Sequence, residues 1–211
     1  MTSWACLGIA AVLAATTLDA QGPGLEVAGL GGGLGLRTAT PGYTDRVTGT
    51  AAGLEGNALL GKAFLDASYL DGTLAAGGGL ASRDVVDGRV DAGLHPAPWL
   101  AIGGGAHLRA YATGAATERW VLWEVRTRAT LGLINHLAEG EVELWRALAA
   151  TVNLPQPFGH AQGGSIGLTI RPPATPWQVG LDYQVDDLEF AGAGQRETLE
   201  AVTVRVGLAV P

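Results

Sequence analysis

The stretch 177–190, WQVGLDYQVDDLEF, most constrains what this chain can fold into, because its side chains alternate in character. The apolar set is Trp177, Val179, Leu181, Tyr183 and Val185, and the set between them is Gln178, Gly180, Asp182, Gln184 and Asp186. Successive side chains of a strand point to opposite faces, so this pattern predicts a strand with one apolar and one polar face. The apolar face of such a strand packs on another sheet in a soluble sandwich, or faces lipid in a membrane barrel.

The same alternation recurs along the whole chain. Ten segments can be read as strands, at 25–38, 46–58, 62–73, 84–94, 99–112, 119–134, 141–153, 164–171, 177–190 and 197–210. Four of their connections are tight, and the other five are looser and alternate with them. An up-and-down barrel with both ends on the same side requires that alternation. We therefore predict an all-β fold, a closed antiparallel up-and-down transmembrane β-barrel of about ten strands.

Composition supports a barrel and excludes one class of partner. The chain has 33 glycines without a collagen period, which favours strands and tight turns over helices. Charged residues make up 16% of the chain, which is low for a soluble surface. The formal net charge of -7 argues against nucleic acid as a partner, because no basic surface is available to neutralise phosphates.

The amino-terminal residues 1–20, MTSWACLGIAAVLAATTLDA, resemble a secretory signal peptide with an apolar core that starts near Cys6. We expect cleavage after Ala20, with Ala15 as an alternative, and a barrel domain over 21–211. The other interpretation is an ordinary buried amino-terminal helix. Because Cys6 is the only cysteine, the mature chain would have neither a disulfide nor a cysteine-ligated metal.

In this register the polar faces of the strands line the lumen. The predicted lumen-lining residues are Arg37, Asp66, Asp91, His107, Arg109, Glu124, Arg126, Arg128, Glu141, Glu143, Asp182, Asp186 and Arg205. Both signs of charge are present and a ten-stranded barrel is narrow, so we expect these side chains to pair and mostly fill it. Glycines predicted to face inward, such as Gly29 and Gly31, leave space for Trp145 and Tyr111, for water, or for a ligand.

Two proline-rich turns of similar sequence, PAPWLAIGGG and PATPWQVGLD, each place a tryptophan at the first position of the following strand. An aromatic side chain at the membrane interface explains this placement, and the alternative is that both tryptophans begin buried strands. The predicted membrane-interface residues are Trp99, Trp177, Tyr69, Tyr183 and Trp123.

Three patterns that carry chemistry elsewhere lack the context they need here. The Gly-x-Ser-x-Gly match at 163–167, with His160 nearby, opens a predicted strand and not a strand-to-helix turn. The segment 56–62 imitates a phosphate-binding loop, but Ala63 stands where a hydroxyl is required. His107 is favoured as a hydrogen-bonded lumen residue over a metal ligand shared with neighbouring acids. We assign no catalytic, metal or cofactor site.

The predicted signal peptide, the alternating segments, the unequal connections and the two tryptophans together resemble a small outer-membrane β-barrel of a diderm bacterium. The resemblance is to a class and not to one family. It implies a location in the cell outer membrane, with membrane lipid and the outer-membrane assembly machinery as partners. The function that we predict is a structural or narrow-pore barrel without catalysis.

Two other classes of function stay open. One is a barrel-embedded envelope hydrolase, with His107 among acids at the long-loop rim. The other is a soluble, lipocalin-like periplasmic ligand binder, with the apolar faces inside and the polar set outside.

Overall fold

The computed structural model describes residues 24–76, 81–114, 116–134, 137–154, 157–192 and 194–210. The predicted signal peptide 1–20 lies outside the described residues. Those residues form ten strands: β1 (Gly24–Thr40), β2 (Tyr43–Leu60), β3 (Ala63–Leu74), β4 (Arg83–Ala97), β5 (Leu100–Ala112), β6 (Thr117–Ile134), β7 (Ala138–Val152), β8 (Phe158–Ile170), β9 (Trp177–Phe190) and β10 (Arg196–Val210). The described part of the chain contains no helix long and apolar enough to cross a membrane.

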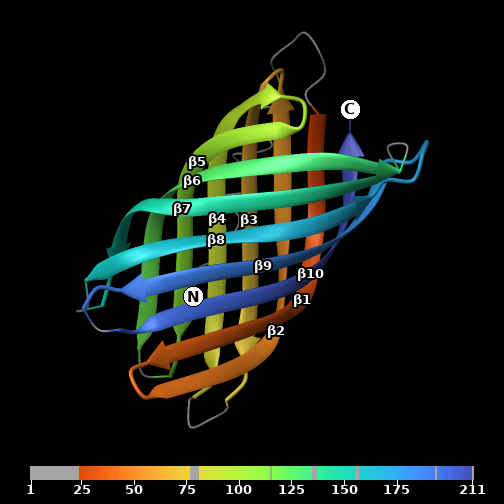
Figure 1. Cartoon of the computed structure of the whole chain (residues 1–211). Coiled ribbons are helices and arrows are strands. Elements are labelled where there is room, and N and C mark those ends of the chain that lie inside the picture. The colour runs from red at the N-terminus through yellow and green to blue at the C-terminus, as the bar shows by residue number, and fades with distance from the viewer. Residues whose placement is uncertain are drawn as a thin grey trace.

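The strands form one closed antiparallel barrel, which confirms the predicted fold class (Figure 1). Each strand pairs with its neighbours in sequence, and β1 also pairs with β10. This closing ladder is continuous from Leu25 opposite Val210 to Ala39 opposite Arg196. Since both edges of the sheet are paired, the described strands leave no open edge for another chain to extend.

The two ends of the barrel differ in their connections. One end, here called the tight-turn end, holds the connections 61–62, 98–99, 135–137 and 171–176, together with Gly24 and Val210. The opposite, long-connection end holds 41–42, 75–82, 113–116, 153–157 and 191–195. The 41–42 connection is tighter than predicted, because Gly42 has a φ of 87° and can adopt the left-handed conformation of a two-residue turn.

Two strands extend into segments predicted as connections. β4 continues through the predicted turn 95–98 as far as Ala97, and β8 begins at Phe158 and not at 164. The β4–β5 register shifts between Leu94 and Ala97, so Pro96 lies at an irregularity where no ladder hydrogen bond from its nitrogen is needed. A proline in the sequence therefore does not always end a strand.

Large apolar side chains cover the outside of the barrel. Leu148 is 74% exposed, and Leu144 on the same strand is 65% exposed. Such a surface suits lipid and not water, because it presents contiguous apolar side chains on many strands. The five predicted interface residues all lie on this outer surface and are 39–57% exposed: Trp99, Trp177, Tyr69, Tyr183 and Trp123. Trp99 and Trp177 stand beside tight turns, and the interface assignment of the set stays a prediction.

On β1 the predicted orientation is wrong. The inward orientation predicted for Gly29 and Arg37 would place Leu34 and Leu36 outside, but these two leucines are buried inside the barrel, at 4% and 1% exposure. Arg37, expected in the lumen, is exposed, and Gly29 faces open space. The reason is that this part of the lumen is itself apolar, so apolar alternation does not distinguish it from the lipid face.

A bulge reverses the orientation at the end of β7. Pairing of β6 with β7 shifts between Trp123 and Glu124, opposite 147–149. Val152, which strict alternation places outside, consequently packs against buried residues of the lumen.

Candidate functional site in the lumen

The half of the lumen near the long-connection end is occupied mainly by apolar side chains, here named the apolar plug, and the carboxylates of Asp45 and Glu197 are buried on the same inner face. The members of the plug are Leu34, Leu36, Val47, Ala51, Leu74, Val85, Tyr111, Leu199 and Ala201, and a second group of Trp120, Leu122, Trp145, Ala161, Leu188 and Phe190. The Trp120 ring packs on Phe190 with ring centroids 4.8 Å apart and meets Phe158 edge-on at 6.5 Å. The sequence alone predicts a lumen lined by charged residues. In this half, most of the buried side chains are apolar instead.

Directly beneath the plug lies a layer of buried ionic groups on β4, β5 and β9. Arg109 donates from Nε to Asp87 at 2.7 Å and from Nη2 to Asp186. The indole N–H of Trp145 donates to the other oxygen of Asp186 at 2.8 Å. The side chains of Arg109 and Asp186 are both fully buried. A buried guanidinium between two carboxylates compensates charges that would otherwise be costly in this environment.

His107 belongs to the same layer. Its Nε2 lies 2.9 Å from Asp87, and its Nδ1 lies 3.2 Å from Glu124. A carboxylate only accepts hydrogen bonds, so both contacts are favourable only when both ring nitrogens carry a proton. His107 is therefore placed as a cation between two anions, and neither nitrogen is left to act as a base.

The carboxylates of Asp87 and Asp186 with the ring of His107 form the one group among the described residues that has metal-ligand proximity. Their ligand atoms lie within 4.8 Å of one another. The Arg109 guanidinium already donates to both carboxylates. A cation of the protein itself thus takes the place that a metal ion would need.

A second layer lies further toward the tight-turn end. Arg126 binds Glu124 and Glu143, and its Nε lies 3.3 Å from Asp91. Arg89 lies 3.5 Å from Glu124 and 4.0 Å from Glu143, and its Nε and Nη2 have no hydrogen-bond partner. Carboxylates from β4, β6 and β7 thus converge on two guanidinium groups.

The next ion pairs are partly exposed. Arg128 donates to Asp66 at 2.5 Å and to Glu143 at 3.3 Å. On the other side of the barrel, Arg205 donates to Glu55 at 2.9 Å and to Thr169 at 2.6 Å. These side chains join strands that are not neighbours in the sheet, such as β3 with β6 and β2 with β10. They therefore connect strands that the backbone ladders of the sheet do not join directly.

The outermost ion pairs stand at the tight-turn end. Arg171 donates to Glu26 and to Glu139, both at 3.1 Å, and to Gln178 at 2.9 Å. The side chains of Arg171, Glu26 and Glu139 are 35–37% exposed. Exposure thus rises from zero beneath the plug to more than a third at this end.

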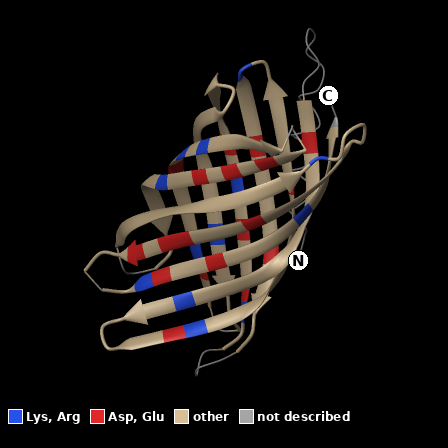
Figure 2. Cartoon of the chain, turned by 45° about the vertical axis from the view of Figure 1, so that its right-hand side comes forward, with Lys and Arg blue, Asp and Glu red and all other residues tan. Residues whose placement is uncertain are grey.

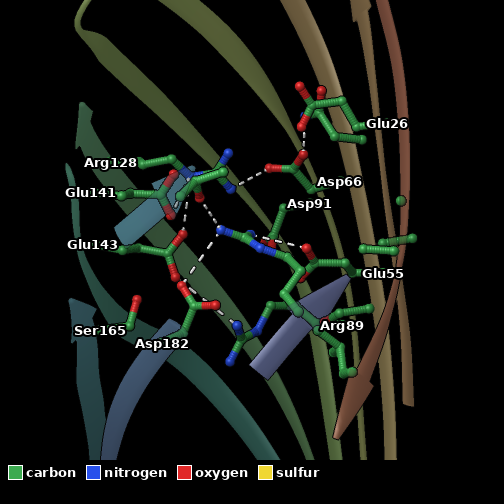
Figure 3. Close-up of a pocket in the computed structure, with 18 of the residues that line it drawn as sticks. Glu26, Glu55, Asp66, Arg89, Asp91, Arg128, Glu141, Glu143, Ser165 and Asp182 are labelled. Atoms are coloured by element: carbon green, nitrogen blue, oxygen red, sulfur yellow. Dashed lines mark hydrogen bonds and ion pairs between the residues drawn. The ribbon is translucent and has the colours of Figure 1, made fainter. Parts of the chain in front are cut away.

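These layers enclose a cavity of about 450 Å³, here named the polar cup (Figure 3). Its lining carries the carboxylates of Glu26, Glu55, Asp66, Asp87, Asp91, Glu139, Glu141, Glu143 and Asp182 and the guanidinium groups of Arg89, Arg126, Arg128, Arg171 and Arg205. Figure 2 shows that acidic and basic positions are interspersed along the strands that form this lumen. The most exposed charged groups of the lining, Arg171, Glu26 and Glu139, lie at the tight-turn end of the cup, and the plug lies at its other end.

The structure places the predicted lumen residues, with the exception of Arg37, on the inner face. The buried ones are Asp91, His107, Arg109, Glu124, Arg126, Glu143 and Asp186, and the partly exposed ones are Asp66, Arg128, Glu141, Asp182 and Arg205. The predicted set missed two important members, Asp87 and Arg89. The signal for both was present, because they share with Asp91 the polar side of the alternation in 84–94.

The residues of the Gly-x-Ser-x-Gly match do not form a hydrolase site. Ser165 lines the cup on β8, whereas the His160 Nδ1 lies 3.7 Å from Glu189 on the outer face of the barrel. The two side chains point to opposite faces of the sheet, so His160 cannot activate Ser165.

No protein-family model matches the sequence, and no curated protein matches it. Solved structures do match. The translocator domain of the autotransporter NalP from Neisseria meningitidis is 12% identical, with a TM-score of 0.50, over 96% of this chain and 94% of that chain. An outer membrane channel from Pseudomonas putida F1 is 10% identical, with a TM-score of 0.50, over 93% of this chain and 98% of that chain. The chain has the fold of an outer-membrane β-barrel. This likeness confirms the predicted fold, and with the apolar exterior it agrees with the predicted outer-membrane location.

Proposed function

We propose that this protein is a non-catalytic outer-membrane barrel that is closed to ion flow. The observation that carries the proposal is the apolar plug, whose buried side chains pack in the lumen at the long-connection end. In bacterial barrels the short turns face the periplasm. The polar cup of this chain would then open to the periplasm, and the plug would seal the outer side.

The plug opposes conduction because an ion that crosses it must lose its hydration shell. Trp120, Leu122 and Leu188 are each 0% exposed. Their only polar group is the indole N–H of Trp120, which already donates to Glu118, so these side chains cannot replace the water molecules around an ion. Transfer of an unpaired ion into such surroundings costs many kcal/mol. Hydrophobic constrictions close channels in this way.

The proposal of no catalysis rests on His107. In the hydrolase alternative this residue would act as a base at the long-loop rim, but it is 0% exposed beneath the plug and both ring nitrogens contact carboxylates. The lipocalin-like alternative requires apolar faces inside and charges outside. The exterior positions of Leu144 and Leu148, together with the ionic layers of the lumen, support the reverse arrangement.

Single-molecule recordings in planar lipid bilayers test the closed barrel. We expect no steady current from the purified full-length chain at any applied voltage, because the plug excludes hydrated ions. Insertion is verified in the same lipid by quenching the fluorescence of the exposed Trp123 and Trp99 with brominated acyl chains. Stepwise currents from verified, folded barrels would show that the lumen conducts and would refute the proposal.

A further inference from the structure

We propose that the polar cup is a binding site for an organic polycation, a linear molecule that carries several ammonium groups. The inference goes beyond the closed barrel proposed above, since it assigns a ligand to a cavity that a purely structural protein would not need. It rests on the charge of the cup, on one buried oxygen atom without a partner, and on the spacing of the carboxylates.

The lining of the cup carries nine carboxylates and five guanidinium groups. Each guanidinium lies within 4.0 Å of at least one carboxylate, and Arg126 and Arg128 each contact three. The basic groups are thus compensated inside the protein, while four carboxylates remain in excess. A concave site with a net negative charge attracts and retains cations.

Asp91 supplies a separate observation. This residue is 1% exposed and lines the cup, and its Oδ1 has no hydrogen-bond partner, while Oδ2 lies 3.3 Å from Arg126. Asp66 lies directly opposite Asp91 in the β3–β4 ladder, so two like charges face each other. A buried carboxylate oxygen without a donor is costly, and a bound ammonium group would provide that donor.

Glu141 and Asp182 mark a second anionic position on the other side of the cup. Both lie opposite Gly167, one on β7 and one on β9, and the glycine between them has no side chain to separate them. Their nearest guanidinium contacts are long, at 3.7 Å from Glu141 to Arg128 and 3.6 Å from Asp182 to Arg205. Neither side chain accepts a hydrogen bond from another described side chain. Figure 3 shows both pointing into the cavity.

The spacing of these groups favours an organic cation over a metal ion. A divalent metal requires several ligand atoms close together. Among the described residues such a group exists only at Asp87, His107 and Asp186, where Arg109 already binds. The carboxylates of the cup are instead spread around its wall, which suits ammonium groups that are separated along a chain.

Equilibrium dialysis of the full-length protein in a non-ionic detergent against labelled spermidine tests the proposal. We expect saturable binding that weakens as sodium chloride increases, because the attraction is electrostatic. We expect the double variant Glu141→Gln with Asp182→Asn to bind at least about tenfold more weakly, the factor that a loss of about 1.4 kcal/mol produces. Asp71→Asn, at an exposed position on the outer face of β3, is the matched control and should bind like the unaltered protein.

Three results would overturn the proposal. One is the absence of spermidine binding by folded protein at low salt. Another is equal binding by the unaltered protein and the double variant, with folding of both verified by their resistance to denaturation in cold detergent. The third is displacement of spermidine by magnesium chloride when the two cations supply the same concentration of positive charge. That result would assign the cup to inorganic cations. Binding in detergent does not depend on membrane location or conductance, so failure here and failure of the closed-barrel proposal are distinguishable.

Discussion

The two halves of the lumen fill the same barrel in different ways. In the long-connection half, rings such as Trp120 and Phe190 pack directly on one another. In the tight-turn half, side chains such as Arg128 and Asp66 reach across the lumen in ion pairs, and a cavity remains between them. Apolar side chains interdigitate to high density, whereas charged groups hold their partners in fixed geometry and keep water nearby. Side-chain packing and charge are therefore distributed separately along this lumen.

The largest expected effect lies at the boundary of the two halves. Arg109→Met leaves Asp87 and Asp186 without their guanidinium partner in fully buried surroundings, and we expect a loss of about 5 kcal/mol in unfolding free energy. Urea unfolding in phospholipid vesicles measures it. Arg46→Met is the control, since the Arg46–Glu200 pair is exposed and contributes about 1 kcal/mol or less. Equal losses in both variants would show that the boundary layer is not specially buried.

A slightly smaller effect is expected inside the plug. Trp120→Ala removes a ring that is 0% exposed and creates a cavity, so we expect the unfolding free energy to fall by about 4 kcal/mol. Leu144→Ala removes a side chain that is 65% exposed on the lipid face, and a much smaller loss is expected. The same urea titration compares the two. If Leu144→Ala cost as much as Trp120→Ala, the distinction between plug and exterior would fail.

The smallest effect is expected in the cup. Glu55→Gln weakens the ion pair with Arg205, whose side chain is partly exposed, and we expect a loss of about 1 kcal/mol or less. The urea concentration at the midpoint of unfolding should therefore be close to that of the unaltered protein. A loss as large as that of Arg109→Met would mean that the cup is as dry as the boundary layer.

The sequence was sufficient for the fold wherever the two faces of a strand differ in polarity. On β5, Ile102 and Leu108 face outward while His107 and Arg109 face inward, because lipid and the ionic layer demand opposite chemistry. On β1 the alternation is between leucine and glycine, and both the plug and the lipid accept apolar groups. Periodicity located two faces there but gave no means to decide which one was inside.

The candidate site was predictable only in part. Alternation indicates that Arg109 and Asp186 face the lumen, but their contact joins β5 and β9, which are not adjacent in the barrel. Such a pairing depends on the curvature and stagger of the closed sheet, and single-strand patterns carry no information on either. The bulge that turns Val152 inward is a further local feature without a signal in the alternation.

The one-sided opening of the cup has a consequence for how it would respond to the membrane potential. Most of a transmembrane voltage drops across the medium of lowest polarisability, which in this lumen is the stack of rings and leucines around Trp120 and Leu36. Solutes in the cup would then experience almost the same potential as the adjoining aqueous compartment. The occupancy of the cup would then depend on the solute concentration in that compartment alone, because solutes would enter and leave from one side of the membrane only.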